Sequence, residues 1–367
     1  MNRHYIAQNR ISGSSWTGDI INYWIDDMTR ERKSGIDVSL TGCTPFHPIL
    51  MHFAARFAKT TYRAFASDHR VLVESNVRCL EHFGHDAVSV ISDPYRETSA
   101  FGAKVTFPED SVPLCTERIV STMDDIRALK NPDVHAAERT RDRIDGVAYY
   151  REIIGDTVPV IGWIEGPLAE ACDLAGVGDV LLKTAVEPDF VRMLMERCMP
   201  TAKAFAKAQI EAGSDIMGVG DAICSQISPA MYEDLVFPLH LELFDYIHGL
   251  GAAVNLHICG DITRHLAILA ETGADIIDID WMVDMDDAFG VVGERPVLCG
   301  NLDPVAVIQN SKERELYEFS RCFVERHAGK RFIFSGGCEI TVGTPPENLM
   351  AMKKAVRGGI NDERRSC

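Results

Sequence analysis

Eight short apolar segments alternate with longer helical patterns along the chain, and this alternation is the feature that most restricts its fold. The segments have the length and composition of buried strands, and patterns such as 187–213 and 229–251 have the periodicity of helices. This order favours a parallel (β/α)8 TIM barrel in the α/β class over an open, doubly wound sheet, which is the alternative. The predicted strands are 36–42, 86–92, 158–166, 215–221, 253–261, 274–280, 296–303 and 331–337.

Two stretches exceed what a plain barrel needs. Residues 1–35 contain an amphipathic pattern, DIINYWIDDMTRERK, which predicts an N-terminal helical extension that closes one end of the barrel. Residues 94–157 are too long for a simple connection after the second strand, and FGAKVTFPED within them predicts an inserted hairpin near the barrel mouth. Pro238 should kink or divide the helix in which it lies. Without internal repeats or a low-complexity linker, we expect 1–367 to form a single domain.

Composition excludes several classes of function. A formal charge of −17 disfavours binding to nucleic acid or to an anionic membrane surface. The N-terminus shows no apolar region of a secretory signal, and no run approaches the roughly 18 apolar residues of a membrane span. The 11 cysteines are scattered, which is typical of reduced thiols. We therefore expect a cytoplasmic protein without a nucleic-acid or membrane partner.

Polar side chains follow almost every predicted strand at its C-terminal end. In barrel enzymes these ends form one rim, and the chemistry lies there. We predict catalytic roles for four carboxylates at this rim. For Glu165, Asp221 and Asp280 the candidate roles are proton transfer, a contact with a metal-binding histidine, or the fourth position on a metal. Salt bridges and helix caps are the alternative for each one. The four carboxylates are Asp93, Glu165, Asp221 and Asp280.

The stretch NLHICGD places His257 and Cys259 two residues apart on one predicted strand. Side chains alternate along a strand, so both face the side opposite to the apolar residues between them, toward the barrel interior. Cys338, at the end of the last strand, is the best third ligand, because Cys299 precedes its strand end. One nitrogen and two sulfur ligands with an open fourth position are typical of a catalytic Zn²⁺ site.

With these residues in place, the chain resembles the methylcobalamin:coenzyme M methyltransferases of the uroporphyrinogen decarboxylase superfamily. The resemblance rests on the His257-x-Cys259 and Cys338 pattern and covers roughly residues 70–355. Further matches are ISDPYRETSAFGAKVTFPED, GNLDP and FSGGCEI. Two features depart from it: the usual opening with an Asp-Arg-x-Pro-type strand is absent, and so is the RQAGRY-like motif of true decarboxylases. The second absence sets decarboxylation below methyl transfer.

The resemblance implies zinc-dependent methyl transfer between a corrinoid (cobalamin) on a partner protein and a small molecule. The small molecule would be a thiol or tetrahydrofolate acceptor, or a methoxylated donor, and the direction of transfer stays open. Tyr95, Arg96 and Asn301 are predicted to contact the cofactor or substrate, and Asp93 takes the position of the decarboxylase's key aspartate. Two alternatives are a metal-free decarboxylase and a non-catalytic barrel that binds a corrinoid protein or a metal. Neither the fourth zinc ligand nor the oligomeric state is predicted.

Overall fold

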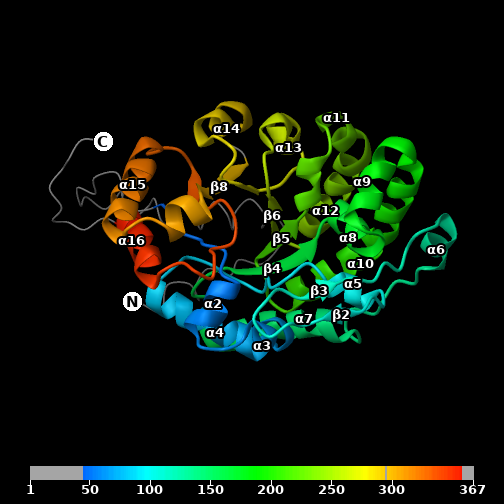
Figure 1. Cartoon of the computed structure of the whole chain (residues 1–367), viewed down its shortest axis with the longest axis horizontal. Coiled ribbons are helices and arrows are strands. Elements are labelled where there is room, and N and C mark those ends of the chain that lie inside the picture. The colour runs from blue at the N-terminus through cyan, green and yellow to red at the C-terminus, as the bar shows by residue number, and fades with distance from the viewer. Residues whose placement is uncertain (1–43, 294–295, 358–367) are drawn as a thin grey trace.

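The computed structural model describes residues 44–293 and 296–357 of the chain. Seven parallel strands form one curled sheet with the order β1-β4-β5-β6-β7-β8-β9, and helices surround it (Figure 1). Each strand overlaps a predicted one, so the TIM-barrel-like α/β fold predicted from sequence is confirmed. The strands are β1 (Val88–Ser89), β4 (Val160–Glu165), β5 (Ile216–Gly220), β6 (Ala253–Ile258), β7 (Ile276–Ile279), β8 (Val297–Leu302) and β9 (Phe332–Gly336).

A short segment at Phe46 links the last strand of the sheet to the first. Phe46 forms a parallel bridge with Phe334 of β9. Its carbonyl accepts a hydrogen bond of 2.8 Å from the backbone N–H of Asp86, just before β1. The sheet therefore curls round until its two edges meet at this segment, which an open sheet does not do. The predicted first strand, 36–42, and the predicted extension, 1–35, lie outside the described residues.

The helices follow the strands in the order expected of a barrel. They are α2 (His52–Phe57), α3 (Tyr62–Ser67), α4 (His69–Phe83), α5 (Arg96–Ala100), α6 (Met123–Ala128), α7 (Glu138–Ile154), α8 (Pro167–Ala175), α9 (Val177–Val186), α10 (Pro188–Glu211), α11 (Pro229–Met231), α12 (Phe237–Gly249), α13 (Leu266–Ala270), α14 (Met285–Val292), α15 (Glu313–Arg326) and α16 (Pro346–Arg357). The helical run does not break at Pro238, but it changes its winding there: a π-helical turn, Tyr232–Val236, directly precedes α12, and Pro238 lies in the first turn of α12.

The segment after β1 contains the predicted hairpin. Strands β2 (Val105–Thr106) and β3 (Leu114–Cys115) pair in antiparallel fashion. Phe107, next to β2, lies under the guanidinium of Arg139 on α7, 5.0 Å from the ring centre to the guanidinium carbon. The hairpin thus packs beside the polar side chains that follow β1.

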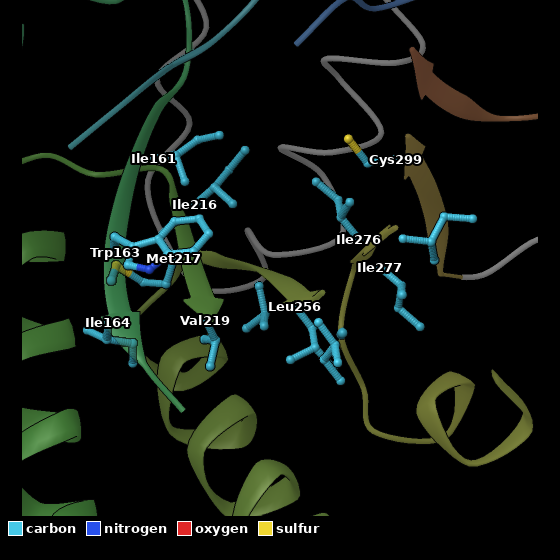
Figure 2. Packing of buried hydrophobic residues seen from close by; sticks show 14 of the residues in the cluster. Ile161, Trp163, Ile164, Ile216, Met217, Val219, Leu256, Ile276, Ile277 and Cys299 are labelled. Atoms are coloured by element: carbon cyan, nitrogen blue, oxygen red, sulfur yellow. The ribbon is translucent and has the colours of Figure 1, made fainter. Parts of the chain in front are cut away.

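The core lies where the strands meet the surrounding helices. Figure 2 shows Ile164, Val219, Leu256 and Ile277 among its buried side chains, and the exposed fraction of each is zero. Alternation along β6 leaves Asn255 and His257 on the other face, toward the barrel interior. The strand therefore serves the core with one face and the site with the other.

Two findings bear on the predictions from composition. Within the described ranges, no helix has both the length and the apolar composition needed to cross a membrane. Eight cysteines in these ranges carry free thiols, as predicted, whereas Cys322 takes part in a disulfide, so the prediction of reduced thiols does not extend to it.

Candidate metal centre

The three predicted ligands meet at the C-terminal ends of β6 and β9. His257 Nε2 lies 2.9 Å from Cys259 Sγ and 4.0 Å from Cys338 Sγ, and the two sulfur atoms are 3.5 Å apart. A zinc ion bound tetrahedrally at about 2.3 Å from sulfur and about 2.0 Å from nitrogen separates its ligand atoms by about 3.5 to 3.8 Å. The observed separations bracket these values. One nitrogen and two sulfur atoms also form the soft donor set that zinc prefers, so the residues fit the ion.

Two turns bring the ligands into position. Gly260 follows Cys259 with a positive φ of 93°, which a residue with a side chain rarely adopts, and its N–H donates to Asp280 Oδ2 at 2.9 Å. Gly337 precedes Cys338 and runs against the backbone at Trp281, where a Cβ would overlap the Trp281 nitrogen. Both glycines are thus needed for the sulfur atoms to converge. Asp280 also helps to position the ligands, because its carboxylate accepts the hydrogen bond that fixes the turn after Cys259.

The carboxylate next to His257 is that of Asp278. Asp278 lies opposite His257 in the register of β6 and β7, is fully buried, and places Oδ2 3.2 Å from His257 Nδ1. A carboxylate at Nδ1 orients the ring and leaves Nε2 for a metal. Sequence analysis names Glu165, Asp221 and Asp280 as candidates for this place, whereas the structure puts Asp278 there. Their other candidate roles, proton transfer and the fourth position on a metal, stay predictions. Strand register carried the signal, because paired residues on neighbouring parallel strands point to the same face of the sheet.

The protonation of the centre depends on its charge. Burial lowers the pKa of His257, but the Asp278 carboxylate outweighs burial and raises it well above its ordinary value. The hydrogen bond with Cys259 and burial together raise the pKa of the Cys338 thiol. The three ligands alone therefore favour a protonated imidazole and a neutral thiol. A cation among them reverses this preference, because ligation requires a neutral imidazole and thiolates.

Trp163 of β4 packs against the metal centre from inside the barrel. Its ring lies over Gly218 and Gly220 of β5: a Cβ on Gly218 would overlap the ring, and one on Gly220 would lie 3.1 Å from it. The ring centre is 6.3 Å from that of His257, and its Nε1 donates to Glu165 Oε1 at 3.2 Å. The two glycines give the indole the space to bond to Glu165 and to pack beside His257. Sequence analysis did not single out this tryptophan.

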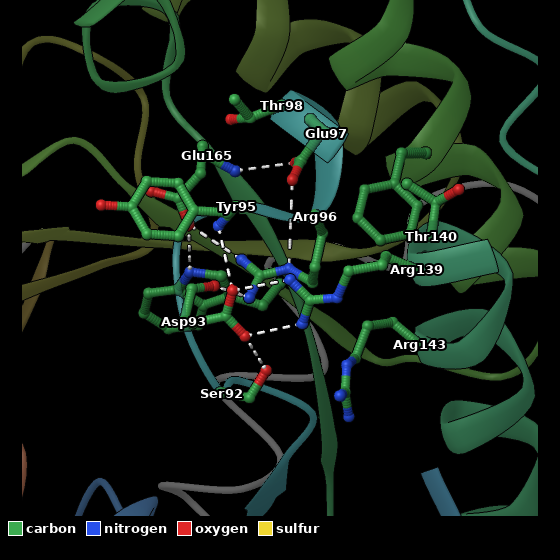
Figure 3. A network of polar contacts seen from close by, with 12 residues as sticks. Ser92, Asp93, Tyr95, Arg96, Glu97, Thr98, Arg139, Thr140, Arg143 and Glu165 are labelled. Carbon is green, nitrogen blue, oxygen red and sulfur yellow. Dashed lines mark hydrogen bonds and ion pairs between the residues drawn. The ribbon is translucent and has the colours of Figure 1, made fainter. Parts of the chain in front are cut away.

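A second polar region follows β1, and its centre is Asp93 (Figure 3). Both Asp93 oxygens accept hydrogen bonds from Arg139 at 2.8 Å, and Ser92 Oγ donates to Oδ2 at 2.6 Å. Burial alone would raise the pKa of Asp93, but the Arg139 guanidinium holds it well below its ordinary value. Asp93 is therefore ionised, and both of its carboxylate oxygens accept hydrogen bonds from protein groups. Arg139, which sequence analysis missed, comes from α7 in the inserted segment.

Arg96 and Glu165 belong to the same network as Asp93 (Figure 3). Arg96 is fully buried; its Nη2 lies 2.8 Å from Glu165 Oε1, and its Nη1 donates to the carbonyl of Asp93. The N–H of Tyr95 donates to Asp93 Oδ1 at 3.1 Å, and burial raises the pKa of the half-buried Tyr95 phenol to about 12. Arg96 thus contacts protein groups, whereas Tyr95 keeps part of its side chain exposed. Their contact with a cofactor stays a prediction.

The two other predicted site residues also have protein partners. Asp221 is fully buried and accepts hydrogen bonds from the N–H groups of Ala169 at 2.8 Å and Leu168 at 3.3 Å, with His240 Nε2 3.0 Å away. It caps α8, and its catalytic role stays a prediction.

Asn301 holds the loop that follows β7. Its Nδ2 donates to the carbonyls of Asp280 at 3.0 Å and Val283 at 2.6 Å. Through Asp280 this loop reaches the turn after Cys259. The predicted role of Asn301 in cofactor binding is untested by these contacts.

Comparison with known proteins places this barrel and its rim in a family. The family model for uroporphyrinogen decarboxylase (URO-D) matches residues 38–359, and the chain belongs to that family. Methylcobamide:CoM methyltransferase MtbA of Methanosarcina mazei is 30% identical over 280 residues, 75% of this chain and 80% of the relative. Uroporphyrinogen decarboxylase of Geobacter sulfurreducens is 26% identical over 313 residues, 84% of this chain and 90% of the relative.

Solved structures agree with the fold. A methyltransferase from Methanosarcina mazei superposes with a TM-score of 0.79 over 93% of this chain and 98% of that chain, at 18% sequence identity. A B12-independent methionine synthase from Shewanella superposes with a TM-score of 0.54 over 79% and 87%, at 15% identity. At these identities the likeness concerns the fold. The similar sequences named above are enzymes, either methyltransferases or decarboxylases.

Proposed function

We propose that this protein is a zinc-dependent methyltransferase that moves a methyl group between a corrinoid on a partner protein and a small molecule. The observation that carries the proposal is the convergence of His257, Cys259 and Cys338 at the rim of the barrel. The 30% identity to a methylcobamide:CoM methyltransferase supports the same reaction class. A cytoplasmic location, where thiols stay reduced, suits a centre built on two cysteines.

The chain's own residues have distinct tasks in this proposal. His257, Cys259 and Cys338 hold the ion, Asp278 orients the imidazole, and Asp280 fixes the turn after Cys259. When bound, zinc lowers the pKa of a thiol ligand or polarises an ether oxygen. The described residues place no carboxylate in the metal-binding group, so the group leaves room for a substrate atom.

The substrate stays at the level of a class. A thiol or tetrahydrofolate as methyl acceptor and a methoxylated compound as methyl donor all offer a sulfur, nitrogen or oxygen atom at the reacting position. Thiols are favoured, because soft sulfur ligands leave zinc electron-rich and a thiolate on such an ion stays nucleophilic. The partner in either direction is the corrinoid protein.

The first experiment separates the three-ligand centre from the rest of the fold. Protein purified without added zinc should contain about one zinc per chain and should demethylate methylcobalamin when a thiol is added. Cys338→Ala should lose the metal and lower demethylation by more than about 100-fold, beyond the usual effect of residues that only orient a ligand. Cys115→Ser is the matched control, a partly exposed cysteine on β3. Full zinc and full activity in Cys338→Ala would refute the proposal.

Decarboxylation of a porphyrinogen is the second candidate, since the sequence match to the Geobacter decarboxylase spans 84% of the chain and that to the Methanosarcina methyltransferase 75%. Asp93 would be its central residue, held ionised by Arg139. Turnover of uroporphyrinogen by zinc-free protein, lost in Asp93→Asn and retained in Cys338→Ala, would establish this candidate in place of methyl transfer.

A further inference from the structure

Four carboxylates lie close to one another, and Arg96 is the guanidinium that faces three of them, Glu97, Glu165 and Asp173. Glu97 lies on α5, Glu165 at the end of β4, and Glu170 and Asp173 on α8. The exposed fractions of the three glutamates are 2%, 7% and 3%. One cation cannot balance four anions in a buried setting, where an unpaired charge is unstable. The cluster must therefore hold protons or bind another positive group.

A small cavity adjoins this cluster, and residues of α5, β4, α8 and α10 line it. It offers about 10 Å³ to the centre of a water-sized molecule, close to what one water needs. Glu97 Oε2, Glu170 Oε1 and Thr201 Oγ1 belong to residues that line it, and none of these atoms has a hydrogen-bond partner within the described part of the chain. Thr201 is 1% exposed, so bulk solvent does not satisfy its hydroxyl.

The three atoms match the hydrogen-bonding capacity of one water molecule. A water can donate to Glu97 and to Glu170 and accept from the hydroxyl of Thr201, and buried waters commonly make about three such bonds. A hard divalent cation is a poorer fit, because it takes six or more oxygen ligands or keeps its own hydration shell. The cavity has neither that many free oxygens nor room for a hydrated ion.

We propose that this cavity holds one water molecule that joins Glu97 and Glu170 into a proton-sharing cluster, and that Glu165 exchanges the cluster's proton at the barrel rim. The second half rests on the proposed function. Methylation of a thiol forms a carbon–sulfur bond, leaves the electrons of the cobalt–carbon bond on cobalt, and releases the thiol's proton. Glu165 lies on the side of the cluster toward the metal centre, because its Oε1 accepts from Trp163 Nε1 and the Trp163 ring packs beside His257. The proton reaches Glu165 through water and not through the indole, and Glu165 takes it up after passing its own proton to the cluster.

Backbone contacts tie the members together. Glu97 Oε1 accepts the N–H of Glu165 at 2.9 Å, so α5 and β4 are held in register at the cluster. Thr98 Oγ1 donates to Glu170 Oε2 at 3.1 Å, which leaves Oε1 for the cavity. Each glutamate thus has one oxygen anchored to protein and, in Glu97 and Glu170, one directed to the water.

Burial favours the neutral carboxyl form throughout the cluster. It raises the pKa of Glu165, Glu170 and Asp173 well above the ordinary value, and that of Glu97 also rises despite Arg96. Other ionisable groups also face the cluster from the elements packed against it. They are Asp93 with Arg139 of α7, Asp221 after β5, Tyr95 before α5, and Cys198 with Arg197 on α10. Asp93 is neutralised by Arg139, and the pKa of the Cys198 thiol is raised, so neither removes the need for protons.

Infrared spectroscopy of the zinc-loaded full chain tests the proposal without reference to methyl transfer. At pH 7 the wild type should show the C=O stretch of protonated carboxylic acids, shifted in heavy water. Glu170→Gln should lose at least one such acid, and Thr201→Val should shift the band, because the water loses a hydrogen-bond partner. Glu196→Gln, an exposed glutamate of α10, should leave the band unchanged.

Each outcome decides the matter. If the wild type shows no band of protonated carboxylic acids at pH 7, the proposed proton-sharing cluster is overturned, even if Glu170→Gln fails to fold. A band that appears only after sodium and potassium are removed would show that a cation occupies the cavity and would also overturn it. With the band present, a kcat profile in Thr201→Val displaced along the pH axis at unchanged KM supports the exchange, and an unchanged profile overturns the role of Glu165. Loss of methyl transfer alone bears on the proposed function and not on the band.

Discussion

The metal centre and the region of Asp93 and Arg139 lie on the same rim, but their side chains are satisfied in different ways. Around Asp93, buried charges are matched by guanidinium groups of the same chain, at 2.8 Å for both Arg139 contacts. At His257, Cys259 and Cys338 the three ligand atoms contact one another, and none of them pairs with a lysine or arginine of the described residues. The first region is completed by folding, whereas the second needs an ion from outside. Charge pairing therefore predicts where stability resides, and unmatched donors predict where a ligand binds.

The largest effect is expected where a self-paired charge loses its partner. Arg139→Met should lower the free energy of unfolding by about 3–5 kcal/mol, because the ionised Asp93 would stay buried without its counter-charge. Chemical denaturation of the two proteins measures the difference. Arg141→Met, on an exposed part of α7, is the control and should change stability by less than about 1 kcal/mol. Equal effects of both variants would contradict the contrast between the two regions.

At the metal centre, removing the charged partner of His257 should lower the affinity for zinc more than it lowers the stability of the fold. Asp278→Asn keeps the size of the side chain but weakens its hold on His257 Nδ1, so zinc affinity should fall by about 10- to 100-fold. Competition with a chelator measures the affinity. Asp284→Asn, whose carboxylate caps α14, tests whether any carboxylate near this rim has the same effect. Unchanged zinc affinity in Asp278→Asn would remove Asp278 from the centre.

A smaller effect is expected at Trp163, which lies between Glu165 and the metal centre. Gly218→Ala introduces a methyl group that overlaps the indole ring, and such overpacking should cost about 1–3 kcal/mol of stability. The tryptophan fluorescence of zinc-loaded and zinc-free protein should then differ less than in the wild type, because the ring moves away from His257. Gly178→Ala on α9, with open space around it, should be neutral or stabilising. Equal stability of both variants would argue against the tight fit of the indole.

The smallest effect concerns the pH dependence of stability. A buried carboxyl whose pKa is raised on folding binds more protons in the folded than in the unfolded chain, so its contribution to stability is lost as pH rises from the unfolded value, about 4.3, through the folded one. Glu170→Gln cannot lose a proton and should gain stability relative to the wild type between pH 5 and pH 9. Thermal denaturation across this range measures the gain.

The contribution of Asp93 to stability depends on pH in the opposite direction. Its pKa is lowered on folding, so its contribution to stability is complete above the unfolded value, about 3.9, and is lost as pH falls through the folded one. Asp93→Asn should therefore lose most stability relative to the wild type at neutral pH and least in strong acid. Parallel pH curves for the Glu170 and Asp93 variants would contradict the comparison of matched and unmatched carboxylates.

Local sequence patterns were enough to predict the strands and the three metal ligands, His257, Cys259 and Cys338. Alternation along NLHICGD places His257 and Leu256 on opposite faces of the strand. The C-terminal ends of β6 and β9 lie on one rim in any parallel barrel. The proximity of Cys259 and Cys338 could therefore be predicted from sequence. The hairpin after β1 was readable for a similar reason, since its turn residues and short apolar strands are adjacent in sequence. The strand at 36–42 and the extension at 1–35 lie outside the described residues, and the single-domain organisation stays a prediction.

The partners of each side chain depended on tertiary structure. Asp278 and Asp280 are two residues apart on one face, and only the register between β6 and β7 decides that Asp278 meets His257 while Asp280 meets Gly260. Arg139 reaches Asp93 from a helix 46 positions along the chain. Sequence by itself determined which residue types reach the rim, because strand periodicity is local. Pairing, burial and charge were decided by the fold, because electrostatic partners are set by distance in space and by the water that packing excludes.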